Sequence, residues 1–197
     1  CSDLDYADCI YWSQYCEWNE DSQECYEVGG GGEDLVYGPF NFESINESNG
    51  LRDGPYYHDG ILYYPTDTNF LLGSIIFTPG FGGASLDILH WGEYFASYGF
   101  ISMIIGPNDA INDSHEQRAL GLLDAIQTIK EENLRAESPL NDLIDTTRFV
   151  VAGHSMGGGA SQIALTIESN HNNHIKHGYF CLINQSRNGR DSAIKLC

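Results

Sequence analysis

The sequence predicts an α/β fold: a mostly parallel β-sheet with helices on both faces, preceded by a small cysteine-rich segment. From residue 60 onward, short apolar runs alternate with stretches of helical periodicity. A glycine-rich turn at 153–159 joins an apolar run to a helical stretch, and four of the six cysteines lie in the first 25 residues. Alternation of strands and helices favours parallel strands, because the helical crossovers cover both faces of the sheet.

The strands are predicted from short apolar runs, which are typical of buried strands. These runs span residues 61–64, 73–78, 100–105 and 148–152, with one further run at 178–184. No apolar run approaches the roughly 20 residues that a membrane helix needs. We therefore expect no membrane span.

The helices are predicted from apolar side chains that recur at helical spacing. The first helix carries Ile88, Trp91, Phe95 and Tyr98 on one face. The second, over about residues 114–134, carries Leu122, Ile126 and Ile129. The third follows the glycine-rich turn and carries Ala160, Ile163, Ala164 and Ile167.

The acidic first part of the chain is predicted to be a separate module. Residues 1–51 hold twelve acids and no Lys or Arg. We assign residues 1–32, which end in a run of four glycines, to a Cys-rich module with its linker, and residues 33–197 to the α/β domain. The whole chain has 9 Lys+Arg against 28 Asp+Glu and a net charge of −19, which excludes a nucleic-acid partner because polyanions repel it.

The cysteines are predicted to form disulfides in an oxidising compartment, with a connectivity that the sequence leaves open. They stand at positions 1, 9, 16, 25, 181 and 197, without the close pairs that seat zinc. The interleaved aromatic residues are expected to be the core of the module rather than a stacking surface for a sugar or polymer. They are Tyr6, Tyr11, Trp12, Tyr15 and Trp18.

The cysteine at position 1 leaves two explanations open. It follows a removed signal peptide, or it carries the lipid anchor of a bacterial lipoprotein. Both explanations place the protein outside the cytoplasm, as a secreted, periplasmic or cell-surface protein.

The motif G-x-S-x-G stands between a predicted strand and a predicted helix, with Ser155 at its centre. A strand that turns sharply into a helix holds the serine in a strained conformation with its hydroxyl exposed, and only glycine leaves room beside it. The new helix directs its N-terminus at this point, so the N–H of Met156 can face a developing oxyanion. A second glycine turn, at 79–83, follows an earlier strand where the other oxyanion donor is required.

Several separated motifs then occur in a familiar order. They stand at 60–65, 79–82, 90–92, 97–100, 145–148 and 153–159. Together they resemble the cutinase-type polyester hydrolases, including the poly(ethylene terephthalate) hydrolases, within the dienelactone-hydrolase-like α/β-hydrolases. The resemblance covers about residues 37–177. It implies that Ser155 attacks an ester carbonyl, that the N–H groups of Phe81 and Met156 hold the oxyanion, and that Gly80, Phe81, His154 and Met156 line the substrate cleft. Family members often carry Tyr where Phe81 stands.

The acid and the base of a catalytic triad are not identified in the sequence. In this fold they follow the serine in the order Asp or Glu, then His. The acids after Ser155 are Glu168 and Asp191, and the histidines are His171, His174 and His177. Asp191 has no histidine after it, Glu168 lies on the helix that leaves the serine, and the side chain of His154 is expected to point away from its neighbour. We therefore expect a truncation or frameshift near residue 177.

The remaining histidines are not expected to be catalytic. The pattern His171-x-x-His174-x-x-His177 lacks the further ligands of a tetrahedral metal site, so a polar loop is the favoured interpretation. His58, His90 and His115 are expected to be structural or exposed. We predict neither a metal nor another cofactor.

The function predicted from these residues is that of a secreted, monomeric serine esterase that cleaves ester or polyester substrates through an acyl-enzyme on Ser155. The alternative is a truncated or degenerate hydrolase that binds a ligand without turning it over.

Overall fold

A computed structural model describes residues 5, 6, 9, 16–19, 22–27, 36–171, 178–183 and 195–196. The described residues belong to two compact units, one reaching to Val36 and one beginning at Tyr37. The larger unit also contains residues 178–183 and 195–196. The boundary predicted between residues 32 and 33 falls outside the described residues and stays a prediction.

The smaller unit contains an antiparallel strand pair, β1 (Cys16–Asn19) with β2 (Glu24–Glu27). A disulfide joins Cys9 to Cys25, and half-buried Trp18 packs against it. The ring of Tyr6, itself exposed, meets that of Trp18 edge-on at 5.4 Å. The disulfide prediction is thus confirmed for this pair, whereas the side chains of the other four cysteines and the rings of Tyr11, Trp12 and Tyr15 lie outside the described part.

The larger unit is built on one sheet. Among the described residues, this sheet has the strand order β3-β4-β6-β5-β7-β8-β9. Its strands are β3 (Phe42–Asn46), β4 (His58–Pro65), β5 (Leu72–Thr78), β6 (Ile101–Gly106), β7 (Ile144–His154), β8 (Gly178–Ile183) and β9 (Lys195–Leu196). The four central strands β6, β5, β7 and β8 are parallel, while β3, β4 and β9 pair antiparallel at the two sides.

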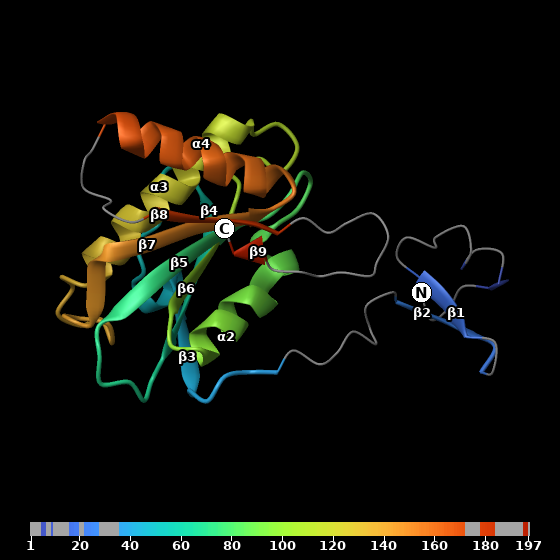
Figure 1. Cartoon of the computed structure of the whole chain (residues 1–197), viewed down its shortest axis with the longest axis horizontal. Helices are drawn as coiled ribbons and strands as arrows, with labels where there is room; N and C mark the ends of the chain where they lie inside the picture. Colours follow the sequence, from blue (N-terminus) through green and yellow to red (C-terminus); the bar gives the residue numbers. More distant parts are fainter. Residues whose placement is uncertain are drawn as a thin grey trace. The chain divides into compact units, whose positions relative to one another are not determined.

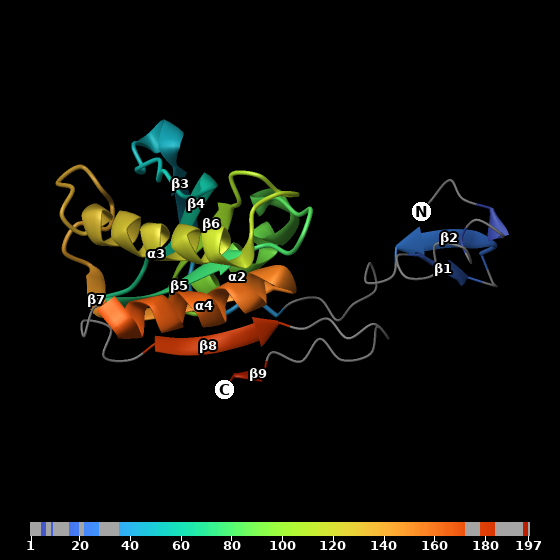
Figure 2. The same ribbon diagram turned by 90° about the horizontal axis from the view of Figure 1, so that it is seen from above.

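Helices cover both faces of this sheet (Figure 1). They are α2 (Leu89–Ser97), α3 (His115–Glu132) and α4 (Met156–His171), with the short 3₁₀ helices η1 (Glu47–Asn49) and η2 (Ser85–Ile88). Helices α3 and α4 lie side by side on one face, as Figure 2 shows from above, and α2 lies on the other. The fold class is confirmed: this is a mostly parallel α/β sheet covered on both sides.

The core follows the alternation of side chains along the strands. Ile76 of β5 and Val151 of β7 pack in the cluster that contains α3 and α4, with Leu122 and Ala160. The next residue of β5, Phe77, packs in the other cluster, with Ala96 of α2 and Ile104 of β6. None of the helices in the described part is both long and apolar enough to cross a bilayer.

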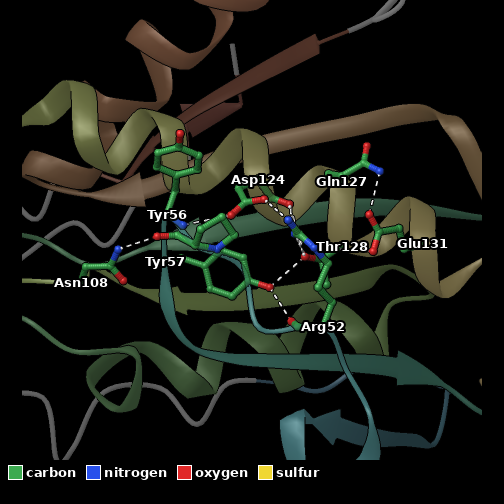
Figure 3. Close-up of polar contacts among 9 residues, drawn as sticks. Arg52, Tyr56, Tyr57, Asn108, Asp124, Gln127, Thr128 and Glu131 are labelled. Carbon is green, nitrogen blue, oxygen red and sulfur yellow. Dashed lines mark hydrogen bonds and ion pairs between the residues drawn. The ribbon is translucent and has the colours of Figure 1, made fainter.

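A polar network fixes the loop between β3 and β4 to α3 (Figure 3). Arg52 pairs with the buried carboxylate of Asp124 at 2.7 Å and donates to the hydroxyl of Thr128 at 2.8 Å. The hydroxyl of Tyr57 donates to the Arg52 carbonyl and lies 2.8 Å from that of Thr128, and the N–H of Tyr56 donates to Asp124. Burial raises the pKa of Tyr57 to about 12. This loop is therefore anchored by side chains 68 to 76 residues away in the sequence.

Candidate active site

Ser155 occupies the turn between β7 and α4, as the sequence predicts. β7 ends at His154 and α4 begins at Met156. Ser155 has φ = 50°, which is the left-handed region that residues other than glycine rarely adopt. Such a conformation costs of the order of 1–3 kcal/mol and persists only where the surrounding structure enforces it. The serine side chain is exposed, so its hydroxyl is open to an incoming reactant.

The glycines around Ser155 are required by close backbone contacts. A β-carbon on Gly153 would overlap the backbone of Gly157. A β-carbon on Gly157 would overlap the Thr78 carbonyl oxygen and lie 2.7 Å from that of Pro79. The turn after β7 is therefore pressed directly against the end of β5, its neighbour in the sheet.

The start of α4 leaves a backbone donor beside the serine. The N–H groups of Gly158 and Gly159 donate to the Ser155 carbonyl at 3.0 and 3.3 Å. Met156 is the first residue of α4, so its N–H lies at the N-terminal end of the helix. N–H groups at this end have no acceptor in a preceding turn, and the helix dipole is positive there. The position of the Met156 N–H suits the stabilisation of negative charge next to Ser155.

The glycine turn at 79–83 is brought to the same place. β5 and β7 pair in parallel with Thr78 opposite Gly153, so the turn begins level with the serine turn. A β-carbon on Gly80 would lie 3.0 Å from His154 Nδ1 and 3.2 Å from Ser155 Cβ. Of the residues predicted to line the cleft, Gly80 and His154 thus adjoin the serine.

The other two residues predicted to line the cleft, Phe81 and Met156, are the sequence neighbours of Gly80 and Ser155. Phe81 follows Gly80 with a side chain 65% exposed, and Met156 follows Ser155 with a half-buried side chain. The roles predicted for all of these residues stay predictions.

The glycine turn is held by contacts on both sides of Phe81. Gly82 has φ = 73° and donates its N–H to the carbonyl of Ala110 at 2.9 Å. The buried side chain of Arg118 donates to the Pro79 carbonyl at 3.2 Å and to the Ala110 carbonyl at 2.8 Å. Arg118 was not predicted as a functional residue from the sequence. The sequence does carry one sign of its burial: Arg118 stands four residues before Leu122, so it lies on the face of α3 that is otherwise apolar.

No base or acid is assigned to Ser155. Among residues 36–168, whose side chains the structure describes, no hydrogen bond joins the Ser155 hydroxyl to a histidine or a carboxylate. α4 carries Glu168 about 18 Å along its axis from Met156, at 1.5 Å per residue. The pairing of Ser155 with a base oriented by Glu168 is therefore ruled out at this distance for a straight helix. His174, His177, Asp191 and the side chain of His171 lie outside the described part.

The other histidines are exposed, as predicted. His58 lies 3.3 Å from the carboxylate of Asp59, and the ring of His90 lies 5.2 Å from that of Trp91. His115 lies beside the first turn of α4, where a β-carbon on Gly159 would be 2.8 Å from its Cδ2. In the part of the chain that the structure describes, no three His, Cys, Asp or Glu side chains gather as metal ligands. The polar loop predicted at 171–177 is outside that part, except for its first residue.

Comparisons with known proteins point to one family. The chain is 35% identical to the cutinase est2 of Thermobifida alba and 33% identical to the cutinase cut1 of Thermobifida fusca, over 124 residues in each case. It is 32% identical over 126 residues to lipase 1 of Moraxella sp. (strain TA144). Each match covers 63% of this chain but only 39%, 37% and 37% of these relatives, so the chain spans about two fifths of their length.

A family model described as PETase, PET hydrolase-like, matches residues 34–177. The matched region contains three of the four parallel strands (β5, β6 and β7), the glycine turn and the strand–serine–helix turn, which are parts of an α/β-hydrolase. The chain belongs to the PET hydrolase-like family of α/β-hydrolases.

Proposed function

We propose that this protein is a carboxylic ester hydrolase of the polyester-cleaving kind, with Ser155 as its nucleophile. The observation that carries the proposal is the left-handed backbone of Ser155 at the end of a central parallel strand, so close to the glycine turn that a β-carbon on Gly80 would lie 3.2 Å from Ser155 Cβ. Backbone strain at an exposed residue is found most often at functional sites, which supports a catalytic role for this serine.

The chemistry follows from these positions. The Ser155 hydroxyl attacks the ester carbonyl, and the N–H groups of Phe81 and Met156 stabilise the negative charge on the carbonyl oxygen. Collapse of this tetrahedral intermediate releases the alcohol and leaves an acyl-enzyme, which water then hydrolyses. The proton of the serine must pass to a base, for which the described residues offer no hydrogen-bonded candidate.

The substrate class is proposed from the relatives and from the surface beside the serine. The relatives are named as cutinases and as a lipase, and all of these names denote enzymes that act on esters. Phe81 belongs to the glycine turn and presents its aromatic ring to solvent directly after Gly80, which adjoins Ser155. Such a ring favours an extended apolar ester chain over a small polar ester.

The cellular location is proposed from the disulfide. The bond between Cys9 and Cys25 is stable in an oxidising compartment, which supports a secreted, periplasmic or cell-surface protein. We further propose that the hydrolase acts as a monomer.

Two measurements test the proposed function. A fluorophosphonate probe reports the nucleophile by a mass increase on the peptide that contains Ser155, and p-nitrophenyl butyrate reports turnover. We expect labelling and turnover in the parent protein, and a loss of at least about 10³-fold in Ser155→Ala. The matched control is Ser44→Ala, an exposed serine on β3, which should label and turn over like the parent.

The same experiment separates the esterase from a binding protein. Folded parent protein that neither labels nor turns over the ester contradicts the proposed function and favours ligand binding without catalysis. Turnover that persists in Ser155→Ala places the nucleophile elsewhere. A rate only about 10³- to 10⁴-fold above water is what the oxyanion donors alone supply, so the esterase proposal requires a parent rate above that range.

A further inference from the structure

Arg118 is one of the most deeply buried side chains of the protein, although it carries a charge. It is 2% exposed and is the fourth residue of α3. Arginine is almost never buried to this extent unless its guanidinium is paired or hydrogen-bonded. Neither of its two described hydrogen bonds goes to a carboxylate: both go to backbone carbonyl oxygens, of Pro79 and Ala110.

Both carbonyl groups belong to the support of the glycine turn. Pro79 immediately precedes Gly80, and the Ala110 carbonyl that accepts from Arg118 also accepts the N–H of Gly82. The guanidinium therefore holds one side of the turn directly and the other side through Ala110. Phe81, whose N–H is the proposed oxyanion donor, lies between these two fixed points.

The identity of the residue matters for this geometry. A guanidinium presents several N–H groups in a rigid plane, so it can bind two carbonyl oxygens on separate segments at once. A lysine ammonium at the same place would reach one of them with comparable geometry. The negative charge of Asp113 acts on Arg118 without an ion pair: Asp113 is a buried residue whose carboxylate accepts the N–H of Asp109.

We propose that Arg118 is a positioning residue for the oxyanion hole: its guanidinium fixes the turn at 79–83 so that the N–H of Phe81 faces the reacting carbonyl before substrate binds. This inference rests on the proposed function of Ser155. A donor that is already in place needs no rearrangement as charge develops, and this preorganisation is the main advantage of an oxyanion hole over water. Arg118 touches no reacting atom in this role.

A purely structural role makes a different prediction. If Arg118 only stabilised the fold, its replacement would lower the melting temperature, while molecules that remained folded would react at the parental rate. If it positions the turn, the folded variant reacts more slowly at unchanged substrate affinity, because the loss lies in the transition state.

The test compares Arg118→Met and Arg118→Lys with the parent, well below the melting temperature of each variant as read by circular dichroism. The rate of Ser155 labelling by the fluorophosphonate and the kcat for p-nitrophenyl butyrate should fall about 10- to 100-fold in Arg118→Met, with KM within about twofold. Arg118→Lys should lie between parent and Arg118→Met. Arg118→Lys retains the positive charge, so it can still be measured if Arg118→Met does not fold.

The matched control is Arg148→Met. Arg148 also donates to a backbone carbonyl, that of Leu71 at 3.0 Å, but at the opposite end of β5 from the turn. This variant should label at the parental rate. Parental labelling by folded Arg118→Met, or an equal loss in Arg148→Met, overturns the proposal.

A readout that does not require activity distinguishes this proposal from the proposed function. If Ser155 of the parent does not label at all, the proposed function has failed. Hydrogen exchange of the amides of residues 80–83 then tests the positioning: we expect at least about tenfold faster exchange in folded Arg118→Met, with the amides of β6 unchanged. Unchanged protection of residues 80–83 overturns the role of Arg118 in either case.

Discussion

Replacement of Gly157 by alanine tests the close packing on which the serine turn depends. The added β-carbon would overlap the carbonyl oxygen of Thr78, and it would lie 2.7 Å from the Pro79 oxygen and 3.0 Å from the Thr78 carbonyl carbon. All three atoms are backbone, so no side-chain rotation relieves the contact. The end of β5 or the start of α4 has to move.

The expected cost follows from two opposing effects. Overpacking of a filled site costs about 1–3 kcal/mol, and contact with fixed backbone puts this position near the upper value. Alanine within a helix stabilises the folded state by about 1 kcal/mol relative to glycine, which offsets part of this cost. We therefore expect the free energy of unfolding to fall by about 2 kcal/mol, which lowers the melting temperature by about 4–8 °C for a protein of this size.

The assay is thermal and urea unfolding followed by circular dichroism, with fluorophosphonate labelling on the folded protein. Gly73→Ala is the matched control, because a β-carbon there would lie 3.7 Å or more from its neighbours. Its melting temperature should stay within about 2 °C of the parent or rise. The labelling rate should fall in Gly157→Ala and not in the control, since the displaced backbone is that of the glycine turn. A Gly157→Ala variant as stable as the parent would refute the steric argument.

Two further predictions concern the network between the β3–β4 loop and α3. Asp124→Asn removes the buried charged partner of Arg52 and should lower the free energy of unfolding, measured in urea, by about 2–3 kcal/mol. Glu131→Gln, at 3.5 Å from Arg52 and 46% exposed, should change this free energy by less than about 1 kcal/mol. Equal effects of the two substitutions would contradict the larger contribution expected from the buried pair. For Tyr57, burial raises the pKa to about 12 from the unfolded value of about 10, so the folded state holds this proton more tightly. The contribution of this shift to the free energy of unfolding is complete below about pH 10 and is lost as the pH rises to 12. Tyr57→Phe should therefore make the plot of unfolding free energy against pH flatter over that interval, and the slope that remains includes Tyr64, whose pKa burial also raises to about 12. A plot parallel to that of the parent would show that Tyr57 titrates like an exposed tyrosine.

The sequence predicts those parts of the fold whose side chains are buried in a regular pattern. The runs at 73–78 and 100–105 are strands shifted by one residue at most, because nearly every side chain in them is buried. β3 was missed, since only Ile45 in it is buried and its other residues carry no period-two signal. The prediction for β7 began at residue 148, four residues late, because Asp145, Thr146 and Thr147 extend this strand with polar side chains.

In the candidate site, residues whose role depends on their sequence neighbours were predicted, whereas residues whose role depends on distant parts of the chain were not. The serine turn was predicted because its cause is local: the glycines that permit the turn stand two residues on either side of Ser155. Arg118 was missed because its role depends on a carbonyl 39 residues earlier in the chain, which no spacing encodes. The base and the acid stay unassigned, because Asp191, the two histidines that follow α4 and the side chain of His171 lie outside the described part.

The parallel pairing of β5 with β7 has a consequence for changes in chain length. The proposed nucleophile follows one strand and a proposed oxyanion donor follows the other, and their relative height is fixed by the pairing of Thr78 with Gly153. One residue inserted into β5 beyond Ser74 would advance the glycine turn by about 3.3 Å and exchange the faces of every following side chain. Insertions between β4 and β5 leave that pairing intact, so natural or engineered variation in length belongs there, at the opposite end of the strand from the chemistry.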